Sequence, residues 1–354
     1  MKANINKSYS GGIVLFAKQP GKTSFSSLFT IKHALETKKV GHTGTLDSFA
    51  QGLLVVMVGS HTRLAQIVTS FDKEYEAIIK FGVETDTLDY SGNIVKTKTL
   101  PTKKDVEYAV KQHIGDLMQS PPLFSAVHVN GKRASDLARS GKKFEIPKRE
   151  ITVYNAEIIE LTYKDNIDIS DVQNKLVEYA HVKFHVSKGT YIRCLARDIG
   201  IKAGSCAHLI GLLRTSVGSF NLNNAAGASL LAPFNIQTVC KNLIKTETNY
   251  YEKELQEEVQ KKITYMDTNL AKECGFIPIT LTEKSKDDFF NGKPLKFDYF
   301  LNPLDIKKNI NNKLPNTVRF AVFSECKVFV GVIESVCNKK TNKTNLVYSF
   351  VIAH

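Results

Sequence analysis

The chain lacks tryptophan, closely spaced cysteines and any long apolar run near its N-terminus. Its cysteines, at 194, 206, 240, 274, 326 and 337, include no Cys-x-x-Cys pair. This spacing argues against a zinc site or a disulfide framework, and it is typical of buried thiols in a reducing cytosol. The apolar run from Ile13 to Ala17 is too short for a signal peptide or a membrane span. We therefore expect a cytoplasmic protein that binds no metal and no membrane.

Acidic residues are outnumbered, with 35 Asp plus Glu against 48 Lys plus Arg, which gives a net charge of +13. Such a surplus suits a protein that neutralises phosphate groups. It is dense between residues 131 and 150, where the basic residues are Lys132, Arg133, Arg139, Lys142, Lys143, Lys148 and Arg149. A nucleic-acid contact and an ordinary solvated face both fit this segment.

A complete phosphate-binding loop is also missing. The segment Pro20-Gly21-Lys22-Thr23-Ser24 ends like such a loop, but Phe16 occupies the place of the required first glycine. No apolar strand ending in Asp is present to hold magnesium. The sequence therefore argues against an NTPase.

What the chain does contain is a glycine-rich stretch around one carboxylate, Gly41-His42-Thr43-Gly44-Thr45-Leu46-Asp47-Ser48-Phe49-Ala50-Gln51-Gly52-Leu53-Leu54. An Asp in a loop is commonly a solvated turn residue or a helix cap. Here apolar neighbours surround it, and a desolvated carboxylate is typical of a functional site. Asp47 is therefore a candidate catalytic acid.

The length of 354 residues and the 42% hydrophobic content predict more than one domain. Strands are expected at 13–16, 75–81, 151–161 and 179–186, and a helix at 24–37 with Phe25, Leu28, Phe29, Ile31 and Leu35 at helical spacing. Residues 241–262 form a connecting helix or linker between a first domain, 1–240, and a β-rich module, 263–354. Strands are expected in that module at 318–323, 328–333 and 346–352.

The glycine-rich stretch closely resembles the catalytic loop of the TruB-type pseudouridine synthases, which act on the T-arm of tRNA. Further segments agree with this family in order and spacing over roughly residues 10 to 220, namely 12–24, 71–75, 82–92, 121–133, 187–193 and 212–214. Ala17, Gln19, Ser48 and Gln51 depart from the family pattern. The resemblance implies an α+β fold with a mixed, mostly antiparallel sheet and flanking helices. It also implies an RNA-contacting insertion at about 124–150 and a C-terminal PUA-like RNA-binding domain.

The resemblance also implies roles for individual residues. Asp47, Tyr75 and Arg193 would be catalytic. Substrate contacts would come from His42, Tyr191, Lys18, Lys132, Arg133 and Arg149. Tyr191 and Lys18 are assigned by motif alone.

Conversion of uridine to pseudouridine breaks the bond from N1 to the ribose and joins the base again through C5. No redox change occurs, so no cofactor is expected. The uridine must be flipped out of the folded RNA. The resemblance implies that Asp47 starts the cleavage, by attack on the nucleotide or by removal of a ribose proton, and we expect Arg193 to keep it ionised.

Two alternatives stay open. The chain could be a related synthase that acts on another RNA, guided by RNA and partner proteins. It could also be a tRNA-binding folding assistant without catalysis. The motifs favour an enzyme that acts on tRNA as a monomer, with no obligate protein partner.

Overall fold

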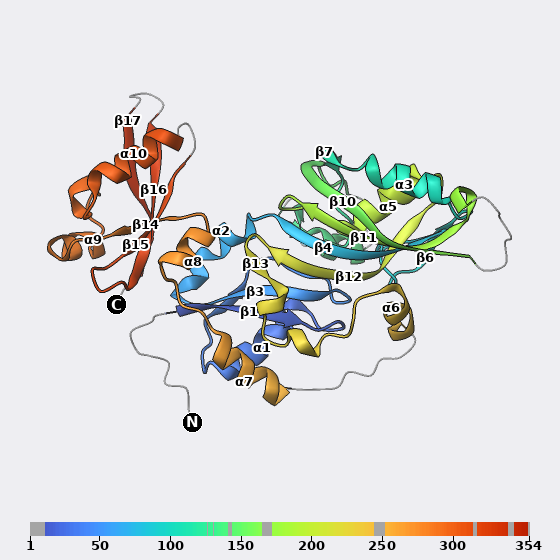
Figure 1. Ribbon diagram of the computed structural model, residues 1–354, viewed down its shortest axis with the longest axis horizontal. Coiled ribbons are helices and arrows are strands. Elements are labelled where there is room, and N and C mark those ends of the chain that lie inside the picture. Colours follow the sequence, from blue (N-terminus) through green and yellow to red (C-terminus); the bar gives the residue numbers. More distant parts are fainter. Residues whose placement is uncertain are drawn as a thin grey trace.

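The computed structural model describes residues 11–125, 127–129, 131–140, 144–164, 172–243, 252–313, 317–338 and 343–352. In the first part of the chain a nine-stranded sheet has the order β1-β3-β12-β4-β11-β10-β7, with β2 and β13 paired at the side (Figure 1). Its strands are β1 (Gly11–Lys18), β2 (Val40–His42), β3 (Gln51–Gly59), β4 (Lys73–Phe81), β7 (Gly115–Gln119), β10 (Arg149–Tyr163), β11 (Val177–Val186), β12 (Ala207–Val217) and β13 (Phe220–Asn221).

The sheet is mostly antiparallel, and the pairing of β3 with β12 is its parallel exception. That pairing spans only Gln51 and Gly52 on β3 against Leu213 and Arg214 on β12, so two larger antiparallel groups meet there. A Cβ on Gly52, whose φ is +109°, would lie 2.4 Å from the Arg214 carbonyl oxygen. Glycine is therefore required at this junction. The predicted mixed, mostly antiparallel sheet is confirmed.

Helices cover the two groups of strands separately. Apolar residues of α3 (Lys103–Lys111) and α5 (Ile192–Lys202) pack on β4, β10, β11 and β12, and α6 (Ile236–Asn242) packs on β4 and β12 from another side. In the other group, α1 (Ser24–Ala34) and α7 (Glu252–Lys262) cover β1 and β3. The short helix α2 (Ala65–Thr69) follows β3.

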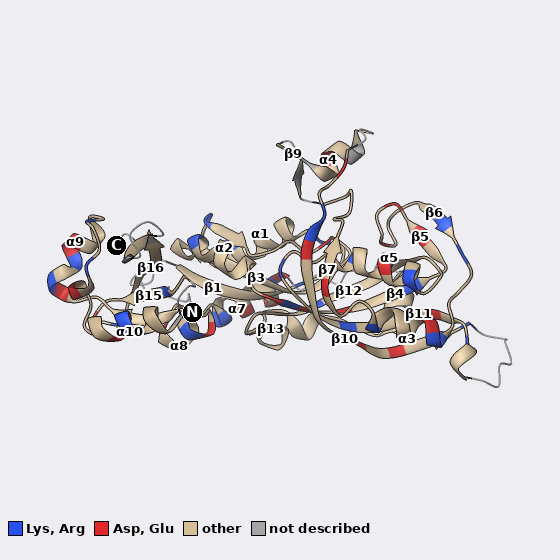
Figure 2. Ribbon diagram, turned by 90° about the horizontal axis from the view of Figure 1, so that it is seen from above, with Lys and Arg blue, Asp and Glu red and all other residues tan. Residues whose placement is uncertain are grey.

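Two hairpins extend from this body. One pairs β5 (Val83–Thr85) with β6 (Ile94–Thr97). The other pairs β8 (His128–Val129) with β9 (Lys132–Arg133) and continues into α4 (Ala134–Arg139). Figure 2 shows β9 and α4 projecting away from the sheet. They lie within the segment 124–150, in which the sequence predicts an insertion.

The segment predicted as a connecting helix does contain one, but α7 is not a free linker. Leu255 and Val259 are buried against α1 and β1, and Gln260 donates to the Ala34 carbonyl oxygen at 2.7 Å. Just beyond α7, Thr264 exchanges backbone hydrogen bonds with Ile13. The helix therefore belongs structurally to the first part of the chain.

The C-terminal part has a four-stranded sheet in the order β14-β15-β16-β17, and β14 is parallel to β15 (orange to red in Figure 1). Its strands are β14 (Ile277–Thr280), β15 (Arg319–Phe323), β16 (Phe329–Asn338) and β17 (Lys343–Val351). Its helices are α8 (Thr268–Glu273), α9 (Lys286–Phe290) and α10 (Pro303–Lys313). The three strands expected here are confirmed, and the four-residue β14 was missed.

The two parts share an apolar cluster. It contains Ile13, Val55 and Met57 from the first sheet together with Leu270, Phe276, Phe323, Phe329 and Ile352 from the C-terminal part. The His61 ring also lies 5.5 Å from the Phe329 ring. We call this set the shared core. Burial of apolar surface from both parts against each other couples their stabilities.

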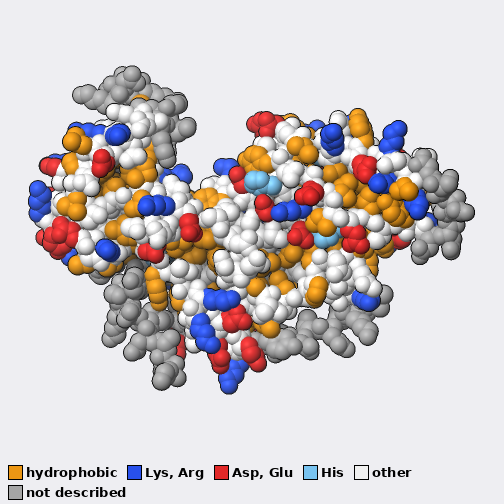
Figure 3. Space-filling model, viewed as in Figure 1, with side chains coloured by type: hydrophobic (Ala, Val, Ile, Leu, Met, Phe, Trp, Pro, Cys, Tyr) orange, Lys and Arg blue, Asp and Glu red, His pale blue; other side chains and the backbone are white. Residues whose placement is uncertain are grey.

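Two further findings concern the surface. In the described part of the chain, no helix is long and apolar enough to cross a membrane. Figure 3 shows one face of the molecule, on which basic and acidic side chains are interspersed.

Candidate active site

Residues 43–50 of the glycine-rich stretch form a loop between β2 and β3, and the start of α1 fixes it. The Ser24 hydroxyl accepts from the Leu46 backbone N–H at 2.8 Å and donates to the Leu46 carbonyl oxygen at 3.0 Å. The Gly21 N–H donates to the Ser48 carbonyl oxygen at 2.8 Å. Asp47 is thus held between two anchored residues, and its side chain keeps 34% of its surface exposed.

Arg193, near the start of α5, meets this carboxylate. Its Nη2 donates to Asp47 Oδ1 at 3.0 Å, and its Nε lies 3.0 Å from Asp47 Oδ2. The arginine side chain is only 6% exposed. The ion pair is therefore largely removed from solvent on the arginine side, where screening by water is weak.

Further acceptors orient the guanidinium group. Its Nη1 donates to the Thr87 carbonyl oxygen at 2.8 Å and lies 3.4 Å from Asp89 Oδ2, and its Nη2 donates to the Phe124 carbonyl oxygen at 3.1 Å. Asp89 is 4% exposed. Arg193 therefore lies between two carboxylates. Sequence reasoning missed Asp89, although it is part of the 82–92 segment that resembles the family.

Two more cations lie beneath the loop. Lys18 Nζ donates to the carbonyl oxygens of Gln19, Lys22 and Ser48 at 3.0, 2.6 and 3.2 Å. Because Lys18 is 0% exposed, this geometry offers a structural support for the loop in place of the substrate contact expected from the sequence.

Arg214 provides the second support, and sequence reasoning missed it as a site residue. Its Nε donates to the Leu53 carbonyl oxygen at 2.7 Å, and its Nη2 donates to the Gly44 carbonyl oxygen at 3.1 Å. The residue is 2% exposed. Both ends of the loop are therefore bonded to one buried side chain from β12.

Burial sets the electrostatics of the site. It raises the pKa of the Asp47 carboxyl above its ordinary value; Arg193 and Lys18 oppose this rise, and Asp89 adds to it. Burial also lowers the pKa of Lys18 to about 7, although Asp47 and the three carbonyl acceptors favour its charged form. The carboxylate thus depends on its neighbouring cations to stay ionised.

Tyr75 and His42 flank the loop. Tyr75, on β4, lies opposite Arg214 in the strand register and packs in the same apolar cluster as Leu46 and Phe49. His42 ends β2, and burial, followed by the charge of Arg214, lowers its pKa. Its Nδ1 is buried and has no hydrogen-bond partner among the described residues.

Tyr191 and Arg149 form a separate contact at the start of α5. The Arg149 guanidinium carbon lies 4.6 Å from the Tyr191 ring centroid. Gln119 fixes Tyr191 by accepting from its N–H at 2.8 Å and donating to its carbonyl oxygen at 3.1 Å. The Arg149 Nε and Nη2 are buried and lack hydrogen-bond partners among the described residues. A cation stacked on an aromatic ring with free donors is suited to an anionic ligand.

Two of the remaining predicted contact residues lie in the projecting hairpin. Lys132 and Arg133 lie on β9 in the projecting hairpin, and Lys132 is exposed. Lys142 and Lys143 lie outside the described residues.

The described cysteines carry no disulfide. Cys194, Cys206 and Cys274 are buried as expected, whereas Cys326 is exposed. Burial raises the pKa of the Cys194 thiol to about 12, which leaves it unreactive at neutral pH. Among the described residues, no group of three or more His, Cys, Asp or Glu side chains could hold a metal ion.

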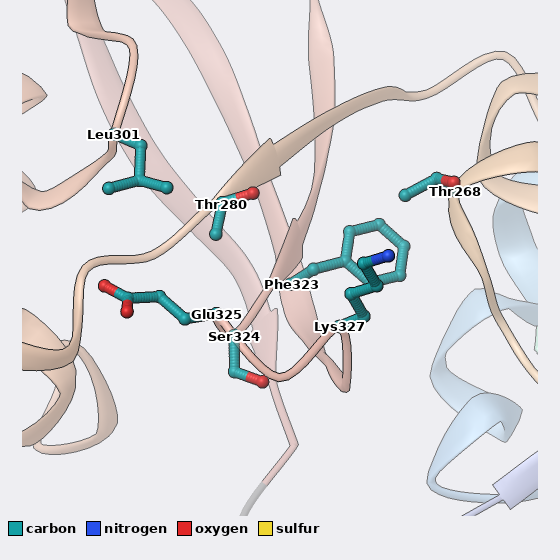
Figure 4. Close-up of a pocket in the computed structure, with 7 residues that line it drawn as sticks. All are labelled: Thr268, Thr280, Leu301, Phe323, Ser324, Glu325 and Lys327. Atoms are coloured by element: carbon teal, nitrogen blue, oxygen red, sulfur yellow. The ribbon is translucent and has the colours of Figure 1, made fainter.

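A surface pocket of about 410 Å³ lies in the C-terminal part, away from the loop (Figure 4). Figure 4 shows Lys327 beside the Phe323 ring, with Glu325 and Leu301 on the other side. None of the residues around Asp47 lines this pocket. It is therefore separate from the candidate active site.

Comparisons with known proteins place the chain in a family. Residues 32–192 match the family model described as TruB family pseudouridylate synthase, N terminal domain. A protein named tRNA pseudouridine synthase B from Treponema denticola is 43% identical over 318 residues, which cover 84% of this chain and 88% of that protein. One with the same name from Borreliella burgdorferi (strain ZS7) is 46% identical over 235 residues, 66% of this chain and 75% of that protein.

Solved structures agree in fold. A structure described as an H/ACA RNP bound to a substrate RNA containing 2'-deoxyuridine aligns with a TM-score of 0.62 at 18% identity, covering 99% of this chain and 87% of that chain. A Cbf5-Nop10-Gar1 complex aligns with a TM-score of 0.61 at 21% identity, covering 97% and 85%. The chain belongs to the TruB family of pseudouridylate synthases.

Proposed function

We propose that this chain converts uridine to pseudouridine in the T-arm of tRNA. The observation that carries the proposal is the pairing of Asp47 with Arg193, in a loop bonded on both sides to buried cations. The relatives named tRNA pseudouridine synthase B support the same reaction and substrate.

The reaction needs an ionised carboxylate beside the flipped nucleotide. The bond from N1 to the ribose breaks, the base turns, a bond from C5 to the ribose forms, and the proton on C5 is lost as N1 gains one. Asp47 begins this sequence by attack on the nucleotide or by removal of a ribose proton. Both routes require the charge that Arg193 stabilises, since burial raises the pKa of Asp47.

Substrate binding would extend outward from the loop. Tyr75 would stack on the flipped base, and the unpaired His42 Nδ1 would contact the nucleotide or a phosphate. Arg149, stacked on Tyr191, is suited to a phosphate oxygen. The hairpin that carries Lys132 and the C-terminal part, as a PUA-like domain, would add contacts farther along the RNA.

We propose that the chain acts as a monomer without an obligate protein partner. We propose that it acts in the cytoplasm on free tRNA. A folding assistant without catalysis has no use for a half-buried carboxylate held against a buried arginine, because that carboxylate repels phosphates. The geometry therefore favours the enzyme.

The test uses purified full-length protein and an unmodified tRNA transcript. We expect the wild type to form pseudouridine in the T-loop, mapped by chemical labelling and reverse-transcription stops. Asp47→Asn preserves shape and removes charge, so tRNA binding should stay within a few-fold while the single-turnover rate falls by orders of magnitude.

Asp116→Asn is the matched control, because Asp116 accepts from Thr152 on the edge strand pair β7–β10 and lies outside the site. Near-normal turnover by Asp47→Asn would contradict the mechanism. Pseudouridine formation by the wild type in another RNA, and not in tRNA, would favour the related synthase.

A further inference from the structure

Two aromatic side chains on α1 face solvent. Phe25 is 63% exposed and Phe29 is 49% exposed, whereas Leu28 and Ile31 on the same helix are buried against the sheet. The sequence predicted a helix here with apolar residues at helical spacing, and the helix is confirmed, but its apolar residues are divided between the sheet and the solvent. Their ring centroids are 5.9 Å apart in an edge-to-face arrangement, so they form one continuous aromatic surface.

A lysine accompanies these rings. The Lys32 ammonium lies 5.4 Å from the Phe25 ring centroid and 5.2 Å from that of Phe29. Lys32 makes no ion pair with an acidic side chain in the described part of the chain, and α1 has no acidic residue in its sequence. Its charge is therefore free to meet an anion. We call Phe25, Phe29 and Lys32 the α1 patch.

The α1 patch begins beside the candidate catalytic loop. Phe25 directly follows Ser24, whose hydroxyl bonds the Leu46 backbone in both directions, and Leu46 precedes Asp47. Figure 2 shows α1 on the same side of the sheet as the projecting hairpin β9 and helix α4. The α1 patch therefore begins one residue along the chain from an anchor of this loop.

The chemistry of the α1 patch fits nucleic acid better than a second protein. Exposed aromatic rings beside an unpaired cation are the pattern of single-strand binding sites, in which bases stack on the rings and phosphates meet the cation. Residues 19–46 also carry Lys22, Lys32, Lys38 and Lys39 against one acid, Glu36. A helix face that docks a second copy of this basic chain would bring like charges together.

We propose that the α1 patch is an RNA-binding platform, on which Phe25 and Phe29 stack against unpaired bases next to the target uridine and Lys32 contacts a phosphate. This inference rests on the proposed function, because it takes the RNA that enters the site at Asp47 as its ligand. The platform supplies binding energy outside the reacting atoms. It therefore acts on affinity and leaves the chemical step unchanged.

The first experiment measures single-turnover rate against the concentration of a tRNA transcript. We expect the double variant Phe25→Asn, Phe29→Gln to raise the half-saturating concentration roughly tenfold or more, with the saturated rate within twofold of the wild type. The double variant Phe25→Tyr, Phe29→Tyr keeps both rings and should bind like the wild type. Lys32→Gln should weaken binding less and reduce its salt dependence.

Tyr108→Gln is the matched control. Tyr108 on α3 is 54% exposed and has the Lys202 ammonium 5.5 Å from its ring, but α3 packs at the other group of strands. Its removal should leave tRNA binding unchanged. Equal melting temperatures of all variants would show that they fold, as expected for exposed side chains.

A second experiment locates the RNA directly. Transcripts with 5-iodouridine next to the target position are irradiated with the wild type, and cross-links are expected in the tryptic peptide of residues 23–32. The inference is overturned if the Asn/Gln double variant binds tRNA like the wild type. It is also overturned if light scattering shows a wild-type dimer that this variant dissociates without loss of RNA affinity.

The two proposals fail separately. A wild type that makes no pseudouridine in tRNA contradicts the proposed function. If the wild type is active and the double variant of Phe25 and Phe29 binds tRNA with the same affinity, only the role of the α1 patch is contradicted.

Discussion

Replacing Arg193 by lysine separates charge from geometry at the candidate site. The guanidinium group reaches acceptors on two sides, with Asp47 and the Phe124 carbonyl oxygen on one and Asp89 and the Thr87 carbonyl oxygen on the other, at 2.8 to 3.4 Å. A lysine ammonium places three donors at one point and cannot span both carboxylates. Arg193→Lys therefore keeps the positive charge and loses at least one contact to Asp47.

The expected magnitude follows from that lost contact. A hydrogen bond to a charged group contributes about 1.5 to 3 kcal/mol. If the contact acts in the transition state, the loss corresponds to a fall of roughly 10- to 150-fold in the saturated rate. The assay is single-turnover release of tritium from C5 of labelled uridine in a tRNA transcript, with tRNA affinity measured in parallel.

Arg197→Lys is the control on the same helix. Arg197 pairs with Asp198 at 2.8 Å, one turn beyond Arg193, and we expect its replacement to change the rate by less than twofold. Equal rates for Arg193→Lys and Arg197→Lys would refute the argument, because Arg193 would then act as an ordinary ion pair.

Three further predictions follow from the electrostatics and the packing. The proposed mechanism requires an ionised Asp47, and burial raises its pKa, so the rate should fall on acidification already above the ordinary carboxylate range. Asp89→Asn removes an anion that adds to this rise, so it should move the acidic limb of the rate profile to lower pH, and a shift to higher pH would contradict the assignment. Folding lowers the pKa of Lys18 from 10.5 to about 7, so its contribution to stability is full above pH 10.5 and is lost as the pH falls through 7. The melting temperature of the wild type minus that of Lys18→Met should therefore increase between pH 7 and 10. A difference that does not change with pH would argue against this assignment. A chain ending at Lys262 should melt at a lower temperature or aggregate, because it exposes the side of the shared core formed by Ile13, Val55 and Met57; a truncated chain with the wild-type melting temperature would show that the first part folds independently.

Local sequence patterns predicted much of the fold. Alternating residues predicted β11, where Val182, Phe184 and Val186 are buried. The Asp47 loop was also predictable, since its anchors to Ser24 and Gly21 lie in adjacent elements. The interaction of Asp47 with Arg193 could be expected only from the family resemblance, because 146 residues separate them.

Other features depend on contacts that no local pattern encodes. Arg214 bonds to Leu53 and Gly44, which precede it in the chain by 161 and 170 positions. The apolar residues of α1 cover more than one side of the helix, so periodicity could not decide that Phe25 and Phe29 face solvent. β14 is four residues long and contains Pro278, too little for a clear strand pattern. The shared core could not be predicted from the sequence. The nearly continuous apolar run of β3 predicts that both faces of this strand are buried, but it does not indicate which elements cover them.

The reach of Arg193 and Arg214 back to the loop also sets an order of assembly. The loop is translated early, but its supports from α5 and β12 follow about 150 residues later in the chain. Contacts of such long sequence separation form late, because much of the chain must be ordered first. A partly synthesised or partly unfolded chain therefore carries Asp47 without the groups that position its loop and keep its carboxylate ionised. The arrangement proposed to be catalytic is therefore complete only once α5 has docked and β12 has joined the sheet.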